Sequence, residues 1–550
     1  SDTVAIDRST VSSAVEASGI GNGGNVEVNT RSLSLTNGTV LSSSTNGQGN
    51  AGGVRVDASD TVAIDRSTVS SAVEASGIGN GGNVDVNTRS LSLTNGAALS
   101  SSTSGQGNAG RIAVVSSQAV FLNNSSISTA VNSTATANQP ATIEIATNQL
   151  ALENHASITA NTIGNGPAGN ISLNADQVRI GSSSEISAAT GGGAGGSIRV
   201  TANSFTASSG GKLVTTTSGS SDAGNISLLV RKDITLTGVG SGLFANTSPN
   251  SSGNGGSIFI DPLSVTIQDG AGIAVNSAGE GAGGDIKIIA DTLTLNERAF
   301  ISAETASNQG GNITLNVRDL LLMRHNSLIS ATAGTEGAGG DGGNITINAR
   351  FIVGVPKENS DITANAFQGR GGNITITTNG IFGLAFRNQL TPLSDITASS
   401  QFGLDGTFTL NTPGIDPTSG LNELPEALVD AEGLVGRDAC AVKQDKIAGG
   451  SSFIITGRGG LPPNPNEPLT PTAGMVEWAS RDRGTPIPPV VVRDRPITNN
   501  SQTSTNIAIQ QAQGWVMSAD GTVILTAQAP TVTPQSPGLS HPGCHLPSGK

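Results

Sequence analysis

The chain has 550 residues, of which 74 are Gly, and its 28 Lys and Arg against 41 Asp and Glu give a net charge of −13. An acidic surface repels phosphate backbones, which argues against a nucleic-acid-binding protein. Only 3% of the residues are aromatic, whereas a globular core of this length would bury more aromatic surface. The 35% of apolar residues is nevertheless too high for a disordered chain, so the composition favours a thin, repetitive core.

The sequence begins inside a repeat. Residues 1–51 recur almost unchanged as residues 59–109, and neither a signal peptide nor an initiator Met precedes them. We therefore expect the chain to begin part-way through a longer protein, with any targeting segment upstream. No apolar run reaches the length of a membrane-spanning helix, so we predict no transmembrane segment.

A shorter repeat underlies this duplication. A Gly-Asn corner followed by an apolar-x-apolar triplet, or a degenerate form of it, opens about fourteen copies spaced 27 to 34 residues apart. We interpret the corner asparagines as structural, because Asn tolerates turn conformations and stacked Asn side chains hydrogen-bond neighbouring coils. Glycosylation is the alternative for those in Asn-x-Ser/Thr sequons, which also include Asn124. The predicted corner residues are Asn25, Asn83, Asn170, Asn225, Asn312, Asn344 and Asn373.

Each copy contains three short strand-like pieces, represented by Ile171 and Leu173, by Val178 and Ile180, and by Ile186. Alternating β-branched residues predict strands with one buried face. Three strands in roughly 29 residues predict an all-β fold, a right-handed parallel β-helix with one coil per repeat and three sheets. About fourteen coils would occupy residues 1–411 and form a rod on the order of 65 Å long.

The coil pattern ends near residue 411. We expect a cap over residues 412–460, with a strand and a short helix at 425–435, because an open solenoid end exposes an unpaired edge and an apolar bore. A flexible tail and a binding role are the alternatives for this end of the chain. Residues 461–505 are rich in Pro and predict an extended linker. Residues 506–550 predict a hairpin around an Asp-Gly turn, followed by a tail.

The two cysteines, Cys440 and Cys544, both lie near the C-terminus. They are candidates for a disulfide that joins the cap to the end of the chain, provided that the protein resides in an oxidising compartment. The alternative is a metal site formed by His541, Cys544 and His545, but Pro542 makes a fixed ligand geometry difficult. We therefore predict neither a metal nor a cofactor.

The coils of the form GGN-[IV]-x-[IVL] resemble those of filamentous haemagglutinin-like exoproteins of two-partner secretion, especially the cyanobacterial members. Residues 424–430 (LPEALVD), 451–463 (SSFIITGRGGLPP) and 513–516 (QGWV) resemble the C-terminal end of that group. The resemblance covers nearly the whole chain and implies a C-terminal fragment of a secreted or outer-cell-surface protein. It also implies export through an outer-membrane barrel partner, by way of an N-terminal domain that is missing here, and a role as an adhesin, haemagglutinin or toxin.

A polysaccharide-cleaving enzyme of the pectate-lyase type is the main alternative, because parallel β-helices also carry such sites. It would need clustered carboxylates beside an Arg or Lys on one outer face. The outward positions of the first strand contain no carboxylate pair on neighbouring coils, and His155 and His325 are expected in turns or at the surface. We therefore predict a non-enzymatic, structural or adhesive rod, with glycans or cell surfaces as candidate partners. The predicted outward column is Glu27, Arg55, Asp85, Ala113, Glu144, Ser172, Arg199, Ser227, Phe259, Lys287, Thr314, Thr346 and Thr375.

Overall fold

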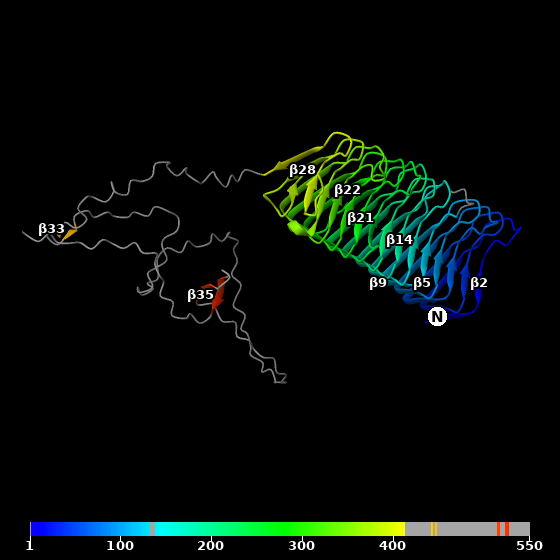
Figure 1. Cartoon of the computed structure of the whole chain (residues 1–550). Coiled ribbons are helices and arrows are strands. Elements are labelled where there is room, and N and C mark those ends of the chain that lie inside the picture. Colours follow the sequence, from blue (N-terminus) through cyan, green and yellow to red (C-terminus); the bar gives the residue numbers. More distant parts are fainter. Residues whose placement is uncertain are drawn as a thin grey trace, which may run out of the picture. The chain divides into compact units, whose positions relative to one another are not determined.

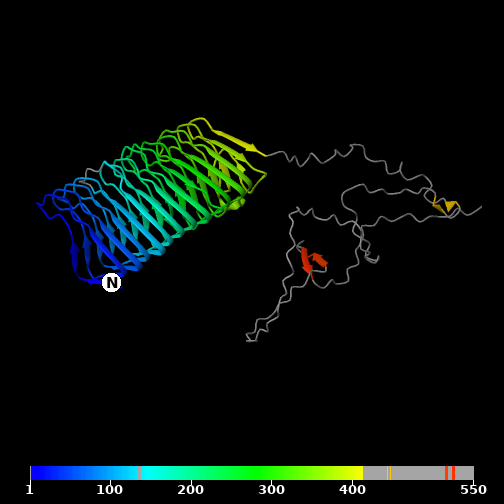
Figure 2. The same ribbon diagram turned by 180° about the vertical axis from the view of Figure 1, so that it is seen from behind.

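The computed structural model describes residues 2–132 and 138–412, together with four short strands nearer the C-terminus. The described part of the first unit confirms the predicted fold: it is a parallel β-solenoid of about 13 turns of about 29 residues (Figure 1). Each strand pairs in parallel with its equivalent in the next coil, and the coils follow the sequence along the shaft, as Figure 2 shows from behind.

The first two predicted strand pieces are joined into one long strand in most coils. The strands that contain them form a sheet that is 17-stranded in the described residues. In many pairs the register shifts near the middle, as between Thr30 and Ser32, and the sheet bends there. The strands of this sheet are β1 (Thr3–Asp7), β3 (Val26–Thr36), β5 (Val54–Asp65), β7 (Val84–Thr94), β9 (Arg111–Asn123), β11 (Thr142–Glu153), β13 (Asn170–Ile180), β15 (Ile198–Ser208), β17 (Ile226–Thr237), β19 (Ser257–Ile260), β20 (Ser264–Gln268), β22 (Asp285–Asn296), β24 (Asn312–Met323), β26 (Ile345–Val353), β28 (Asn373–Thr377), β29 (Gly380–Phe382) and β32 (Thr407–Asn411).

The third predicted strand piece forms a second, 15-stranded sheet of the described shaft. The sequence predicts three sheets, but the described shaft has two, because the first two predicted strands continue through the bend as one strand of the same sheet. A further side of each coil is held by single parallel bridges, such as Thr190 to Thr217 and Thr217 to Thr247. The strands of the second sheet are β2 (Thr10–Ser12), β4 (Val40–Ser42), β6 (Thr68–Ser70), β8 (Ala98–Ser100), β10 (Ser126–Ser128), β12 (Ser157–Thr159), β14 (Glu185–Ser187), β16 (Lys212–Val214), β18 (Gly242–Phe244), β21 (Gly272–Ala274), β23 (Phe300–Ser302), β25 (Leu328–Ser330), β27 (Asp361–Thr363), β30 (Ala385–Phe386) and β31 (Asp395–Thr397).

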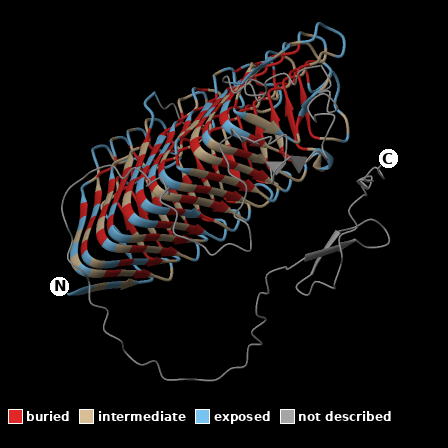
Figure 3. Ribbon diagram, turned by 90° about the vertical axis from the view of Figure 1, so that its left-hand side faces the viewer, coloured by how far each residue is buried: buried red, intermediate tan, exposed pale blue. Residues whose placement is uncertain are grey.

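The core is a set of apolar columns inside the coils (Figure 3). Ile171, Ile198, Ile226 and equivalent residues of successive coils stand in register, and each is almost fully buried. Burying one such side chain contributes about 1.5–3 kcal/mol. Many repeated aliphatic side chains therefore stabilise a core that contains few aromatic residues. Phe205 is a large exception among the fully buried side chains.

The Gly of the repeat signature lies where neighbouring coils approach most closely. A Cβ atom on Gly224 would lie well within 3.0 Å of the carbonyl oxygen of Gly196, and the same holds for Gly256 against Gly224. Real Cβ atoms essentially never approach other atoms so closely. Gly at this corner therefore allows neighbouring coils to stack at their closest approach.

The shaft ends with a 3₁₀ turn, η1 (Pro356–Glu358), and strands β27 to β32. Beyond it, β33 (Val442–Lys443) pairs with β34 (Lys446–Ile447), and β35 (Gly514–Met517) pairs with β36 (Val523–Thr526), both antiparallel. The second pair coincides with the predicted hairpin. The predicted helix at 425–435, the linker, Cys440 and Cys544 lie outside the described residues. No helix within the described residues has the length and apolarity to cross a membrane.

Candidate functional site

A groove runs along the outside of the bend in the long strands. It has a volume of about 900 Å³ and is lined by residues of seven successive coils, from Thr201 in β15 to Asn379 after β28. With about 4.8 Å between coils, seven levels span on the order of 29 Å along the shaft. We refer to this feature as the bend groove.

One position of the repeat lies at the bend. In several coils it holds a hydroxyl residue that donates a hydrogen bond to a carbonyl just beyond the bend, as Ser116 does to Ala119 (2.9 Å) and Thr88 to Ser90 (3.2 Å), whereas in others it holds Ala, as at Ala58 and Ala202. In the groove, the equivalent position holds the buried side chains of Val230, Ala290, Val317 and Ala349, and then Thr378, which donates to the Gly380 carbonyl (3.0 Å). The apolar surface that is open to the groove comes from Leu263 and from the half-buried Leu229 and Ile289.

Three kinds of polar group flank the floor of the bend groove. Asn348 donates from Nδ2 to Oδ1 of Asn316 (2.9 Å), so their amides form a short ladder along the groove. Arg318 forms an ion pair with Asp291 of the preceding coil. The Arg350 guanidinium lies 5.6 Å from the centre of the Phe351 ring. The groove thus presents amide, guanidinium and carboxylate groups along its length.

Two exposed charged side chains of the groove have no hydrogen-bond or ion-pair partner among the described residues. They are Arg231 in β17 and Asp261, which follows β19. Leu263, in the same interruption between β19 and β20, is 54% exposed. These groups are therefore open to a ligand that lies in the groove.

Asp261 and Asp291 bring two carboxylates into the groove on neighbouring coils. The register of the strands confirms the predicted outward column residue by residue, and it adds Thr409 beyond Thr375. Asp261 and Asp291 do not belong to that column, because they lie at the bend. A glycosidase needs one carboxyl that holds a proton, usually in a buried, apolar setting. Asp261 is exposed and Asp291 is held by Arg318, so neither has that setting.

The corner asparagines make contacts between coils. Asn373 donates to Asn344 and Asn344 donates to Asn312 (both 3.0 Å), whereas Asn25, Asn170 and Asn225 accept the backbone N–H of the next coil. None of the seven predicted corner residues has a positive φ. The left-handed conformation occurs at the corner after the long strand, where Asn37 and Asn95 have φ of 57°. Tolerance of a left-handed turn therefore does not explain Asn at the predicted corner.

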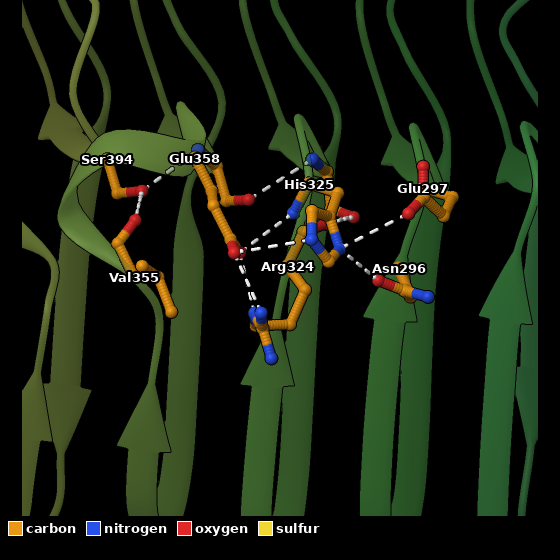
Figure 4. A network of polar contacts seen from close by, with 9 residues as sticks. Asn296, Glu297, Arg324, His325, Val355, Glu358 and Ser394 are labelled. Carbon is orange, nitrogen blue, oxygen red and sulfur yellow. Dashed lines mark hydrogen bonds and ion pairs between the residues drawn. The ribbon is translucent and has the colours of Figure 1, made fainter.

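A second polar cluster surrounds His325 at that later corner (Figure 4). Arg324 donates two hydrogen bonds to the Glu358 carboxylate (2.6 and 2.7 Å). The ring of His325 contacts Asn296 through Nδ1 (2.7 Å) and Glu358 through Nε2 (3.3 Å), and Glu297 lies 3.4 Å from Nδ1. As expected, His325 lies in a turn, with φ of 50°.

This cluster fastens the 3₁₀ turn η1 to the preceding coils. The Arg324 guanidinium lowers the pKa of Glu358 from 4.5 to about 2, and the backbone N–H of His325 adds to the effect against the opposing effect of burial. A carboxylate held in this way is a structural anion, because a proton donor must be protonated at the working pH. Among the described residues, no group of three His, Cys, Asp or Glu side chains is placed to hold a metal ion.

Glu358→Gln is expected to remove an acid-sensitive part of the stability. Because the folded pKa of Glu358 is lowered, its contribution is complete above about pH 4.5 and is lost as the pH falls towards 2. The wild-type melting temperature should therefore fall more steeply over this range than that of the variant, which starts lower at neutral pH. Glu280→Gln, at an exposed position, is the control and should follow the wild type. Parallel curves for wild type and Glu358→Gln would contradict the assignment.

In comparisons with known protein families, curated proteins and solved structures, none matched this chain.

Proposed function

We propose that the chain forms the shaft of an adhesive rod outside the cell and that it has no catalytic activity. The observation that carries the proposal is the repetitive solenoid, in which about 13 similar coils present aligned polar side chains on the outer faces of their described residues. Stacked coils provide stiffness through backbone hydrogen bonds and apolar columns. A repetitive outer surface provides many weak contacts, which together give strong attachment.

The resemblance of the coils and C-terminal segments to filamentous haemagglutinin-like exoproteins supports export by two-partner secretion. In this proposal, an outer-membrane barrel would transport the protein, and the shaft would fold after export. An antibody against the shaft should label intact source cells or their culture medium. Labelling that requires permeabilised cells would contradict an extracellular location.

Adhesion without chemistry is tested with the full chain coupled to beads. The beads should adhere to cells or to glycan-coated surfaces, whereas beads that carry the heat-unfolded chain should not. A panel of soluble polysaccharides incubated with the chain should show no new reducing ends. Absence of adhesion to every surface would contradict the adhesive role.

A polysaccharide-cleaving enzyme is the second candidate, and the two carboxylates of the bend groove are the observation in its favour. Release of reducing ends that is lost in both Asp261→Asn and Asp291→Asn would establish this second function. It would also refute the non-enzymatic rod.

A further inference from the structure

We infer that the bend groove binds one chain of a linear, uncharged polysaccharide that lies parallel to the shaft axis. This inference builds on the proposed adhesive function, because it assigns a ligand class and a place to one of the contacts. It rests on three properties of the groove: its shape, its free donors and acceptors, and its apolar floor.

The shape of the groove fits an extended polymer. It is open along its length, and its lining residues repeat once per coil over seven coils. A compact small molecule would contact two or three coils and leave the remaining levels unused. A polymer whose units repeat on a similar scale would meet equivalent groups at successive levels, and binding would strengthen with chain length.

The free polar groups fit hydroxyl groups. A hydroxyl both donates and accepts hydrogen bonds, so a chain rich in hydroxyls needs both functions from the protein. Arg231 is a free donor and Asp261 a free acceptor, and Arg350 adds a guanidinium that has no ion-pair partner among the described residues. The Asn316–Asn348 ladder offers amide groups between them.

The groove carries charges of both signs. A uronate or sulfate chain would find donors in Arg231 and Arg350, but Asp261 and Asp291 would repel it from within the groove. The net charge of −13 would also oppose its approach. An uncharged chain avoids both costs.

The floor of the groove supplies apolar surface for the sugar rings. The ring faces of a sugar carry C–H groups, which pack against apolar side chains while the hydroxyls at the ring edge reach polar groups. Leu263, which is 54% exposed, and the half-buried Leu229 and Ile289 offer apolar surface along the groove. Phe351, which is 36% exposed, lies beside Arg350.

The first coils contain a natural comparison. The bend there also forms a hollow, of about 430 Å³, lined by Asn29, Asp57, Asn87 and Arg89. Its polar groups already have partners: Asn87 donates to Asp57 (2.6 Å), Arg55 pairs with Asp57 (2.6 Å), and Arg89 lies 3.8 Å from Asp60. Position along the bend alone therefore does not leave polar groups free for a ligand.

The test compares the full chain with the double variant Arg231→Ala/Arg350→Ala by affinity electrophoresis. The gels contain a linear uncharged glucan, mannan or xylan, or anionic polygalacturonate. We expect retardation by at least one uncharged polymer, weakened about tenfold or more in the double variant because several hydrogen bonds are lost. Leu263→Ala should weaken the same interaction, and Arg89→Ala should leave it unchanged. Retardation by the uncharged polymer should be similar at about 0.05 and 0.5 M salt.

Three outcomes would overturn the inference: no retardation by any uncharged polymer, undiminished retardation of the double variant, or salt-sensitive retardation by polygalacturonate alone. Because both arginines are exposed, the circular dichroism spectrum and melting temperature of the double variant should match those of the wild type. Bead adhesion without polymer binding would refute the groove and leave the rod proposal intact. Polymer binding accompanied by cleavage would refute the non-enzymatic rod and leave the groove intact.

Discussion

Gly52→Ala is expected to destabilise the first coils of the shaft by about 3 kcal/mol or more, whereas Gly53→Ala should change their stability by less than about 0.5 kcal/mol. A Cβ atom on Gly52 would overlap the carbonyl oxygen of Gly24 and crowd the Ser43 hydroxyl. A Cβ atom on Gly53 would be 3.5 Å from its nearest neighbour, the Asn25 side chain, which is ordinary contact. The two substitutions therefore add the same methyl group at adjacent positions, but only the one at Gly52 is expected to destabilise the coils.

Hydrogen exchange measures this difference where it arises. Amides of β4 and β5 should lose protection in Gly52→Ala and keep it in Gly53→Ala, since local opening free energies report on individual parts of a solenoid. The position equivalent to Gly169 in the preceding coil is Ala141, so one coil accommodates a methyl group here. Equal protection in the two variants would show that neighbouring coils separate enough to admit a side chain at little cost, and the close-approach explanation of the Gly column would be wrong.

The register of the shaft could be predicted because the same corner and strand residues recur in every copy of the repeat. Residues such as Glu27, Arg55 and Asp85 align as their positions in the repeat require, since a slip by one residue would turn apolar side chains outward. The joining of two strand pieces could not be read in the same way. It depends on the backbone path at the bend, where the residues after Thr30 and Ala58 interrupt the alternation without a Gly or Pro to end the strand.

The bend groove was missed because its residues lie at the bend, between the two predicted strands and outside the outward column. One signal was present in the sequence. Aligned by coil, the bend position holds a hydroxyl in Thr88, Ser116 and Thr147 and an apolar side chain from Ala175 and Ala202 to Val230 and Val317. Recognising it requires knowing that the earlier hydroxyls bond to carbonyls across the bend, and that information comes from the structure.

The last coil depends on a buried pair of acids held by one arginine. Asp395, at the start of β31, is fully buried and forms an ion pair with Arg387, and it also accepts a hydrogen bond from the Thr391 hydroxyl (3.2 Å). Asp361 of the preceding coil accepts the backbone N–H of Asp395 (2.9 Å). Burial raises the pKa of Asp361, and the charge of Asp395 adds to this effect. Arg387 is thus the cation that compensates two neighbouring carboxyl groups.

Arg387→Ala is expected to destabilise this coil by about 3 kcal/mol or more, because it leaves a buried carboxylate without its partner. Protection of β31 amides from hydrogen exchange should fall by the corresponding factor, whereas Arg370→Ala, at an exposed position, should leave it unchanged. The defect should be largest at neutral pH. Because the folded pKa of Asp361 is raised, its ionisation weakens the fold as the pH rises, and protonation at lower pH removes that penalty.

The double variant Arg387→Ala/Asp395→Asn separates lost charge compensation from lost packing. Replacing the carboxylate with an amide keeps its size and removes the uncompensated charge, so the double variant should recover most of the protection of β31. If it remains as unprotected as Arg387→Ala, the arginine acts through the packing of its side chain and its hydrogen bond to the Ser394 carbonyl (3.2 Å). The terminal coil would then be held by the shape of the loop before β31.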